Sequence, residues 1–351
     1  MPRPYGILRE EFKIRQRGIW SIIPSFLIER ERCCSHGGNQ RRILPFLLGR
    51  RFLAEADSQR ILLRVLVLAC LAYSVLILYE VRMSPQLNVM IYGFFPHSFA
   101  QHVRGSGFRP LVFMNHGLWL AIFVAMATLA ALALWRDGTP RATRPRWLLA
   151  GLYLLVVLVL CRSLGALALT LLFAPLLLFA PRKTQLLLAA VVAGIVLIYP
   201  TMRGADLVPV DAIYRATERI NPARAGSFQT RLINEDRLLA HAQRKPLAGW
   251  GSWGRNRVYN EDGRDITTTD GYWIIVVSTF GWLGYIAQFG LLTVPLLMLG
   301  LQRNRLDLSF ATSGLALILG VGLIDLIPNA TISPVLWLMA GSMMGRFQTA
   351  T

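Results

Sequence analysis

Charged residues are scarce in this chain, and acidic residues are absent from its longest apolar runs. Of 351 residues, 16% are charged and 54% are hydrophobic, a composition that excludes an ordinary soluble globular domain of this length. The runs at 118–135, 147–161, 164–180 and 185–200 contain no Asp or Glu and approach the length needed to cross the hydrocarbon of a bilayer. The composition predicts an integral membrane protein whose chemistry lies between helices or on a loop.

Cysteine is also rare, and its spacing matches no metal site. Cys70 and Cys161 lie in apolar runs, where cysteine usually behaves as a small buried hydrophobe, while Cys33 and Cys34 adjoin each other. The sequence has no Cys-x-x-Cys pair and no Cys/His spacing typical of zinc. We therefore expect no structural metal and no cofactor.

Basic residues outnumber acidic ones, 37 to 19, which gives a formal net charge of +18. They lie mostly between the apolar runs and in the first sixty residues. This distribution favours membrane topology and anionic lipid headgroups over nucleic acid as its explanation. The lipid bilayer is thus the first expected partner.

The order of apolar and polar segments predicts an all-α protein with about eight membrane-spanning helices and one large periplasmic loop. Residues 1–60 form a basic cytoplasmic arm, with surface helices near 19–27 and 43–52 or, alternatively, with little order. Residues 61–200 hold the first five spans and an outer loop at 80–117. The large polar loop is 201–271, and 272–351 holds an interfacial helix and three spans. The expected spans are 61–79, 118–135, 147–161, 164–180, 185–200, 284–301, 309–327 and 332–347.

Two of these boundaries are unusual. Only Arg162 and Ser163 separate the third and fourth runs, so the helices are short there or the stretch is one kinked unit. The run at 272–301 is too long for one straight span, and the glycines at 281 and 284 predict a break. With the N-terminal arm inside, the Arg-rich connectors at 136–146, 182–183 and 303–305 are cytoplasmic, and both polar loops are periplasmic.

The large loop carries a series of motifs in a fixed order. Residues 227–231 read Ser-Phe-Gln-Thr-Arg and precede a helical stretch at 232–243. Residues 246–254 read Pro-Leu-Ala-Gly-Trp-Gly-Ser-Trp-Gly, and 267–273 read Thr-Thr-Thr-Asp-Gly-Tyr-Trp. An apolar run containing Gly-Trp-Leu-Gly at 281–284 follows.

This order resembles the O-antigen ligase and polysaccharide polymerase superfamily of bacterial inner-membrane proteins. In that family a large periplasmic loop holds an Arg, a helix, a Pro-Leu-x-Gly-x-Gly turn, and a His-Asn-x-Tyr segment that opens a helix with Gly-x-x-Gly. The resemblance covers about 227–301, and Arg162-Ser163 is similar to a family Ser-Arg pair in reverse order. Asp270 and Gly271 stand where the family has His and Asn, as in a subgroup of exopolysaccharide polymerases.

The resemblance implies a metal-independent glycosyltransferase that moves an oligosaccharide from undecaprenyl pyrophosphate to an acceptor hydroxyl. Arg231 and Arg162 would hold the pyrophosphate, because arginine offers planar and permanently charged donors. Asp270 would be the acceptor base or orient the acceptor. Candidate residues for glycan binding are Trp250, Trp253, Tyr272 and Arg109. Other polysaccharide assembly proteins are possible partners in this interpretation.

Each of these residues also has a simpler explanation. Asp270 precedes an apolar run, as a helix N-cap does, and Trp250 and Trp253 are typical of interfacial anchors. Arg231 belongs to a loop with eleven basic residues, and Arg162 could end a helix. The histidines of the first outer loop are not spaced as metal ligands on one helix face. Asp325 is a carboxylate in an apolar run, near Pro328 at the outer end of its span.

Three alternatives to a polymerase remain at the level of sequence. A ligase would transfer the same donor to a lipid acceptor. A transporter of lipid-linked sugars would carry charges inside several spans and show symmetry between halves. A non-catalytic assembly component would have dispensable loop arginines and a dispensable Asp270.

Overall fold

The computed structural model describes residues 34–350 except 97, 106, 139–140, 211–213, 216–217, 220–221 and 252–253, and gives no side-chain burial for 34–42, 222–225 and 227–228. The surface helix expected near 19–27, Cys33, His97 and Trp253 lie outside the described residues. The chain forms two compact units, 1–44 and 45–351. The helix α3 (Cys34–Phe52) crosses the boundary between them, and everything below concerns the second unit.

The second unit is mostly helical, and every expected span overlaps one of its helices. These are α4 (Ala56–Met83), α6 (Gly117–Asp137), α7 (Arg144–Leu160), α8 (Leu164–Phe179), α9 (Arg182–Gly204), α12 (Tyr272–Leu301), α13 (Phe310–Asp325) and α14 (Pro334–Ala350). Within the described chain, five helical segments are long and apolar enough to cross a membrane: α4, α6, 141–160, α9 and α12. The protein is therefore a multi-pass membrane protein; α8 and α13 are shorter apolar helices.

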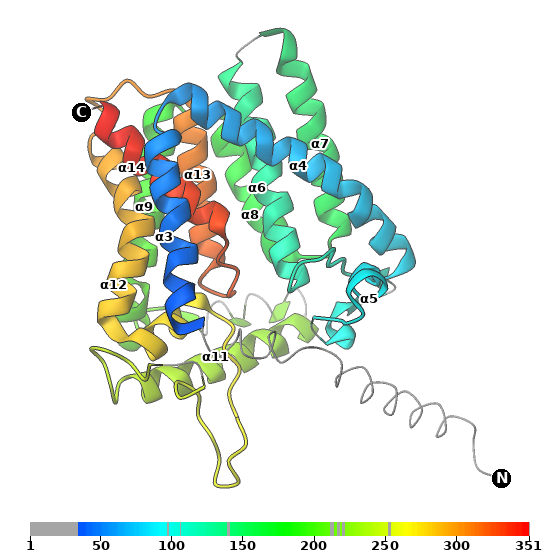
Figure 1. Ribbon diagram of the computed structural model, residues 1–351, viewed down its shortest axis with the longest axis vertical. Helices are drawn as coiled ribbons and strands as arrows, with labels where there is room; N and C mark the ends of the chain where they lie inside the picture. Colours follow the sequence, from blue (N-terminus) through cyan, green and yellow to red (C-terminus); the bar gives the residue numbers. More distant parts are fainter. Residues whose placement is uncertain are drawn as a thin grey trace, which may run out of the picture. The chain divides into compact units, whose positions relative to one another are not determined.

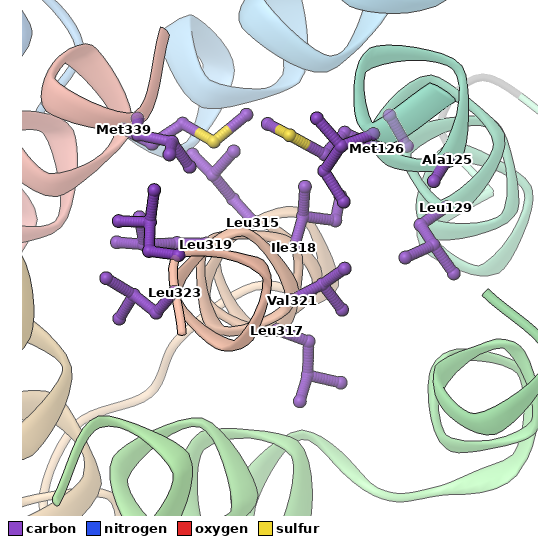
Figure 2. Close-up of a cluster of buried hydrophobic side chains, with 14 of the residues drawn as sticks. Ala125, Met126, Leu129, Leu315, Leu317, Ile318, Leu319, Val321, Leu323 and Met339 are labelled. Atoms are coloured by element: carbon purple, nitrogen blue, oxygen red, sulfur yellow. The ribbon is translucent and has the colours of Figure 1, made fainter. Parts of the chain in front are cut away.

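The centre of the unit is α13, which is buried on nearly every side. It packs against α4, α6, α8, α9 and α14. In Figure 2 its leucines, Ile318 and Val321 point outward in several directions, toward Met126 and Leu129 of α6 and Met339 of α14. A helix that is apolar all round has to be enclosed by other helices or lipid, and here other helices enclose it.

Small residues allow α14 to lie directly against the second half of α3. Gly341 and Gly345 are four residues apart, and a side chain on either would meet the backbone of Phe46 or Arg50. Gly49 faces the backbone of Leu338 in the same way. Such small residues four apart bring helix backbones into close contact where hydrophobic burial alone gives little driving force.

Both unusual boundaries are resolved as breaks in the helices. α12 loses helical geometry at Gly281, where φ is 65° and ψ is −167°, as the glycine pair predicted. α7 and α8 are separate helices, and Arg162 between them has a φ of 52°. Three residues, 161–163, separate α7 from α8, and both helices pack on α6.

The first outer loop folds back onto the end of α4. It contains α5 (Leu87–Tyr92), η1 (Phe99–His102) and a hairpin of β1 (Val103–Arg104) with β2 (Gly107–Phe108). Glu80, fully buried at the end of α4, accepts backbone N–H groups of Leu111 and Val112 at 2.7 and 2.9 Å. This buried carboxylate fixes the segment that leads from the hairpin to α6.

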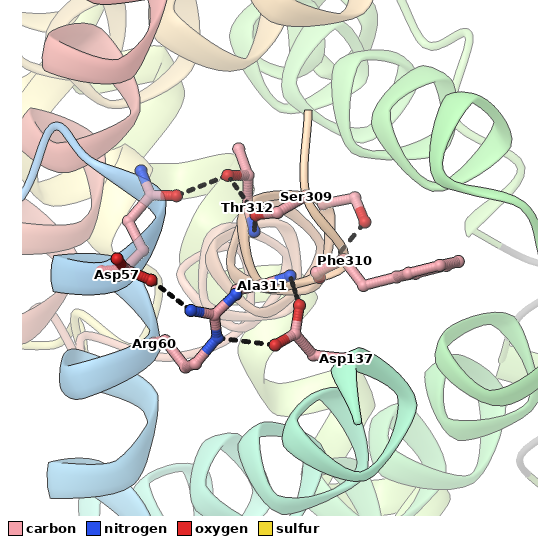
Figure 3. A network of polar contacts seen from close by, with 9 residues as sticks. Asp57, Arg60, Asp137, Ser309, Phe310, Ala311 and Thr312 are labelled. Carbon is pink, nitrogen blue, oxygen red and sulfur yellow. Dashed lines mark hydrogen bonds and ion pairs between the residues drawn. The ribbon is translucent and has the colours of Figure 1, made fainter. Parts of the chain in front are cut away.

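A polar network joins helices at the end of the bundle away from the outer loops (Figure 3). Arg60 of α4 donates to Asp137 at 2.6 Å and also pairs with Asp57. Asp137 in turn accepts the Ala311 N–H at the start of α13. The far end of α13 lies roughly 24 Å away by helix rise, near α11 (Pro222–Ala242), which crosses the opposite end of the bundle in Figure 1.

Candidate anion-binding cleft

Three arginines from distant parts of the sequence line one cleft at the outer-loop end of the bundle. Its volume is about 230 Å³. Arg104 and Arg109 come from the first outer loop, and Arg231 comes from α11. The remaining lining residues are Leu118, Ser163, Leu164, Gly165, Ala166, Pro328 and Asn329. We call this space the anion-binding cleft.

Arg109 is held firmly although it is charged. Its side chain is 3% exposed, and its Nη2 donates to the carbonyl oxygen of Arg162 at 3.2 Å. The backbone N–H of Arg109 donates to His102 O at 2.7 Å, which continues the hairpin pairing. Gly117, the first residue of α6, leaves room for the aliphatic part of this arginine. The sequence motifs gave no sign that Arg109 and Arg162, 53 residues apart, would meet.

Arg162 connects the α7–α8 turn to the first outer loop. Its guanidinium donates to the carbonyl oxygen of Arg104 and lies against Gly107, where any side chain would collide with it. It does not line the cleft itself, but its backbone and side chain hold both Arg104 and Arg109 in place. Arg162, which we expected to hold the pyrophosphate, therefore lies beside the cleft and contacts Arg104 and Arg109.

The first turn of α8 forms one wall of the cleft. Ser163 is its N-cap, and the structure shows no hydrogen bond from the Ser163 side chain to the turn. The backbone N–H groups of a first helical turn have no partner within the helix, and the helix dipole places partial positive charge there. Together with three arginines, this end of α8 gives the cleft a strong preference for an anion such as phosphate.

Arg231 and Asp270 form an ion pair. Arg231 Nε is 3.6 Å from a carboxylate oxygen of Asp270, and both side chains are about one-third exposed. Arg231 Nη1 also approaches the carbonyl oxygen of Pro328 at 3.5 Å. The arginine therefore bridges the start of α12 and the turn after α13.

The N-cap explanation for Asp270 does not hold. The N-cap of α12 is Gly271, and no side chain caps the helix there. A side chain at Gly271 would collide with the carbonyl oxygen of Ile327, so the chain passes too close to the turn after α13 for any residue but glycine. Asp270 is consequently directed to Arg231 instead of to the helix N-terminus.

The turn after α13 is itself fixed by a buried carboxylate. Asp325 accepts Asn329 Nδ2 at 2.8 Å and the hydroxyl of Thr331. The backbone N–H of Tyr272 donates to Leu326 O at 3.0 Å. Asp325 is therefore a buried carboxylate whose hydrogen bonds are satisfied within this turn, and it shapes the cleft wall.

The aromatic candidates lie apart from the cleft. Trp250 stacks on His241, with ring centroids 4.1 Å apart, and its indole donates to His241 O. Lys245 covers Trp250 at 4.3 Å. Tyr272 is buried, and its hydroxyl donates to Gln288 Oε1 at 2.6 Å within the bundle. Among the described residues, neither aromatic ring lines the cleft, and Trp253 lies outside them.

Two residues of this region were absent from the predicted site. Arg104 reaches the cleft from the β1–β2 hairpin, which has no sequence signature beyond Gly105 and Gly107. Glu235 is four residues after Arg231 on α11, so the helical period places both on one face. Burial raises the pKa of the Glu235 carboxyl to about 7, against the opposing effect of Arg203.

No group of three or more His, Cys, Asp or Glu side chains that could hold a metal occurs in the described part of the chain. The rings of His102 and His116 are 5.4 Å apart, but His116 Nδ1 accepts the N–H of Leu118 and caps α6.

No family model, curated protein or solved structure matches this chain.

Proposed function

We propose that this chain is a bacterial inner-membrane glycosyltransferase that polymerises oligosaccharide repeats carried on undecaprenyl pyrophosphate. In this proposal α4, α6, α7, α8, α9, α12, α13 and α14 all cross the membrane. The outer loops 80–117 and 201–271 then lie on the periplasmic face, where polysaccharide repeats are joined. The Arg-rich connectors support this orientation, because they lie at the end of the bundle opposite to the outer loops. Asp137, Arg182 and Asp307, which lie in or next to these connectors, make their contacts at that end.

The observation that carries the proposal is the concentration of arginine in the anion-binding cleft. Arg104, Arg109 and Arg231 line about 230 Å³ beside the first turn of α8. A diphosphate carries charge that fixed guanidinium groups and helix N–H groups neutralise without a metal ion. Because the cleft is at the end of an apolar bundle, a lipid-linked diphosphate can enter it with its hydrocarbon tail still in the bilayer.

The chemical step needs one base and one stabilised leaving group. The acceptor hydroxyl oxygen attacks C1 of the donor sugar, and the bond from C1 to the phosphate oxygen breaks. The leaving group is undecaprenyl pyrophosphate, whose negative charge the arginines stabilise in the transition state. The hydroxyl proton passes to the carboxylate of Asp270, which lies beside Arg231 and therefore beside the diphosphate.

Complementation of cells that lack this chain tests the proposal, with the polysaccharide resolved by length on a gel. Arg231→Ala and Asp270→Ala are expected to abolish long polymer and to leave single lipid-linked repeats. Arg237→Ala is the matched control, because Arg237 is on the same helix and exposed. Full rescue by both site variants, at normal protein levels, would remove the catalytic assignment. Loss of polymer without accumulated repeats would instead indicate a role before transfer.

A further inference from the structure

Glu235 is a buried carboxylate on α11, one helical turn from Arg231 of the cleft, that the proposed reaction does not use. Its side chain is almost completely enclosed, with the residue 6% exposed. It lies on the face of α11 that packs against the first half of α12, where Trp273 is fully buried. Ionised carboxylates are rarely buried in this way, because removing the charge from water is costly unless a cation compensates it.

The cation whose charge stabilises ionised Glu235 is already shared. Arg203, at the end of α9, lowers the pKa of Glu235 but also donates to Asp236 at 2.5 Å. Asp236 and Asp270 both act in the opposite direction and raise the pKa of Glu235. Arg203 therefore compensates the negative charge of ionised Glu235 only in part.

Two uncharged groups complete the surroundings of this carboxyl. The indole of Trp273 on α12 favours the ionised form and lowers the pKa of Glu235, although its buried Nε1 makes no hydrogen bond of normal geometry. Tyr199 on α9 is close enough for the charge of Glu235 to act on its hydroxyl. The net result of burial and these neighbours is a pKa of about 7, so the carboxyl changes charge in the neutral range.

Glu235 is also next to the part of the cleft that binds anions. It lies one helical turn after Arg231 on α11, and Asp270, the ion-pair partner of Arg231, interacts with it electrostatically. When Glu235 is ionised, its negative charge adds to that of Asp270, the ion-pair partner of Arg231. The same extra negative charge repels a bound diphosphate at short range, where protein screening is weaker than that of water.

We propose that Glu235 is a positioning residue that acts through Arg231 and Asp270 to set the affinity of the cleft for a lipid-linked diphosphate, weakening it when the carboxyl is ionised. This inference rests on the proposed function, because it assumes that the cleft holds a diphosphate. Neutral Glu235 leaves Arg231 available to the donor. Ionised Glu235 favours release of the diphosphate product.

The test is binding of geranylgeranyl diphosphate to the full chain in nanodiscs of neutral lipid. Between about pH 6 and pH 8, which bracket the neutral range, the dissociation constant of the wild type is expected to rise about tenfold more than that of Glu235→Gln. The probe also titrates, but equally in both proteins, so the difference isolates Glu235. Glu261→Gln removes an exposed carboxylate from the same outer segment and should behave as the wild type.

A second variant guards against a purely structural effect. Trp273→Phe removes the indole that lowers the pKa of Glu235, so the midpoint of the affinity change should move to higher pH. Equal pH dependence in the wild type and Glu235→Gln, with an unmoved midpoint in Trp273→Phe, would overturn the role of Glu235 alone. Failure of the wild type to bind the probe at any pH would overturn the diphosphate cleft as well.

Discussion

Gly249 lies so close to Gly281 that a Cβ on Gly249 would be 2.5 Å from the backbone nitrogen of Gly281. The two glycines come from two segments far apart in the sequence, the turn after α11 and the break in α12. Backbone N–H groups of Trp250 and Gly251 donate to Ser278 O and Thr279 O, and that of Trp282 donates to Pro246 O. The turn thus pairs with the carbonyl groups that the break in α12 leaves available.

Replacing Gly249 with Ala should destabilise the protein by about 2 kcal/mol or more, because the methyl group collides with backbone and the φ of 67° disfavours a side chain. Gly263→Ala is the matched control, since its φ is 72° but nothing lies within 4 Å of the added carbon. Thermal unfolding in detergent would compare the two. An equal loss in both variants would show that φ alone, and not the contact with Gly281, is responsible.

The polar network around Arg60 gives a second prediction. Arg60→Ala leaves the Asp137 side chain, which is 6% exposed, without its ion pair. We expect a loss of about 3 kcal/mol in unfolding free energy, because a buried charge without its partner is costly. Arg182→Ala removes a partner of Asp307, which is 93% exposed, and should cost less than about 1 kcal/mol. Comparable losses in chemical denaturation would contradict the importance of burial.

Much of the fold follows from the sequence because apolar runs and breaking residues are local signals. The run lengths predicted the helices, and Gly281 predicted the break in α12. The hinge at Arg162 left two possibilities, and the structure shows two helices, with the backbone of Arg162 in a left-handed conformation. Glu80 was assigned to a loop, although it lies in the last turn of α4 and is buried, since two of the three N–H groups that it accepts come from residues about thirty positions later.

The cleft was less predictable because its parts are distant in sequence. Arg231 and Asp270 were selected from motif order, and they do form an ion pair. The meeting of Arg109 with Arg162 depends on how the first outer loop folds onto the α7–α8 turn. Trp250 looked available for a glycan, but its ring faces are used by His241 and Lys245 from the preceding segment. Local composition cannot distinguish an open aromatic ring from one already stacked.

The raised pKa of Glu235 leads to a prediction of how the free energy of unfolding depends on pH. Its pKa is raised from 4.5 to about 7, so the folded state binds a proton that the unfolded state has already lost. The resulting stabilisation is present below about pH 4.5 and is lost as the pH rises through 7. Relative to the wild type, Glu235→Gln should therefore gain thermal stability on going from pH 5 to pH 8, by roughly 2–3 kcal/mol. A constant difference between the two proteins across this range would contradict the raised pKa.

The hydrogen bonds of Glu80 predict that this single carboxylate keeps the first outer loop ordered. Its two oxygens accept three backbone N–H groups, those of Leu87, Leu111 and Val112. Glu80→Gln replaces one accepting oxygen with an amide that donates, so one set of these bonds is lost. Hydrogen–deuterium exchange should show faster exchange at Leu111 and Val112, with residues in α13 unaffected. The exposed Glu261→Gln serves as control for the loss of charge. Because the same loop carries Arg104 and Arg109, the variant should also bind geranylgeranyl diphosphate more weakly. Weaker binding with unchanged hydrogen–deuterium exchange would contradict this prediction. It would show that the charge of Glu80, and not the position of the loop, affects binding.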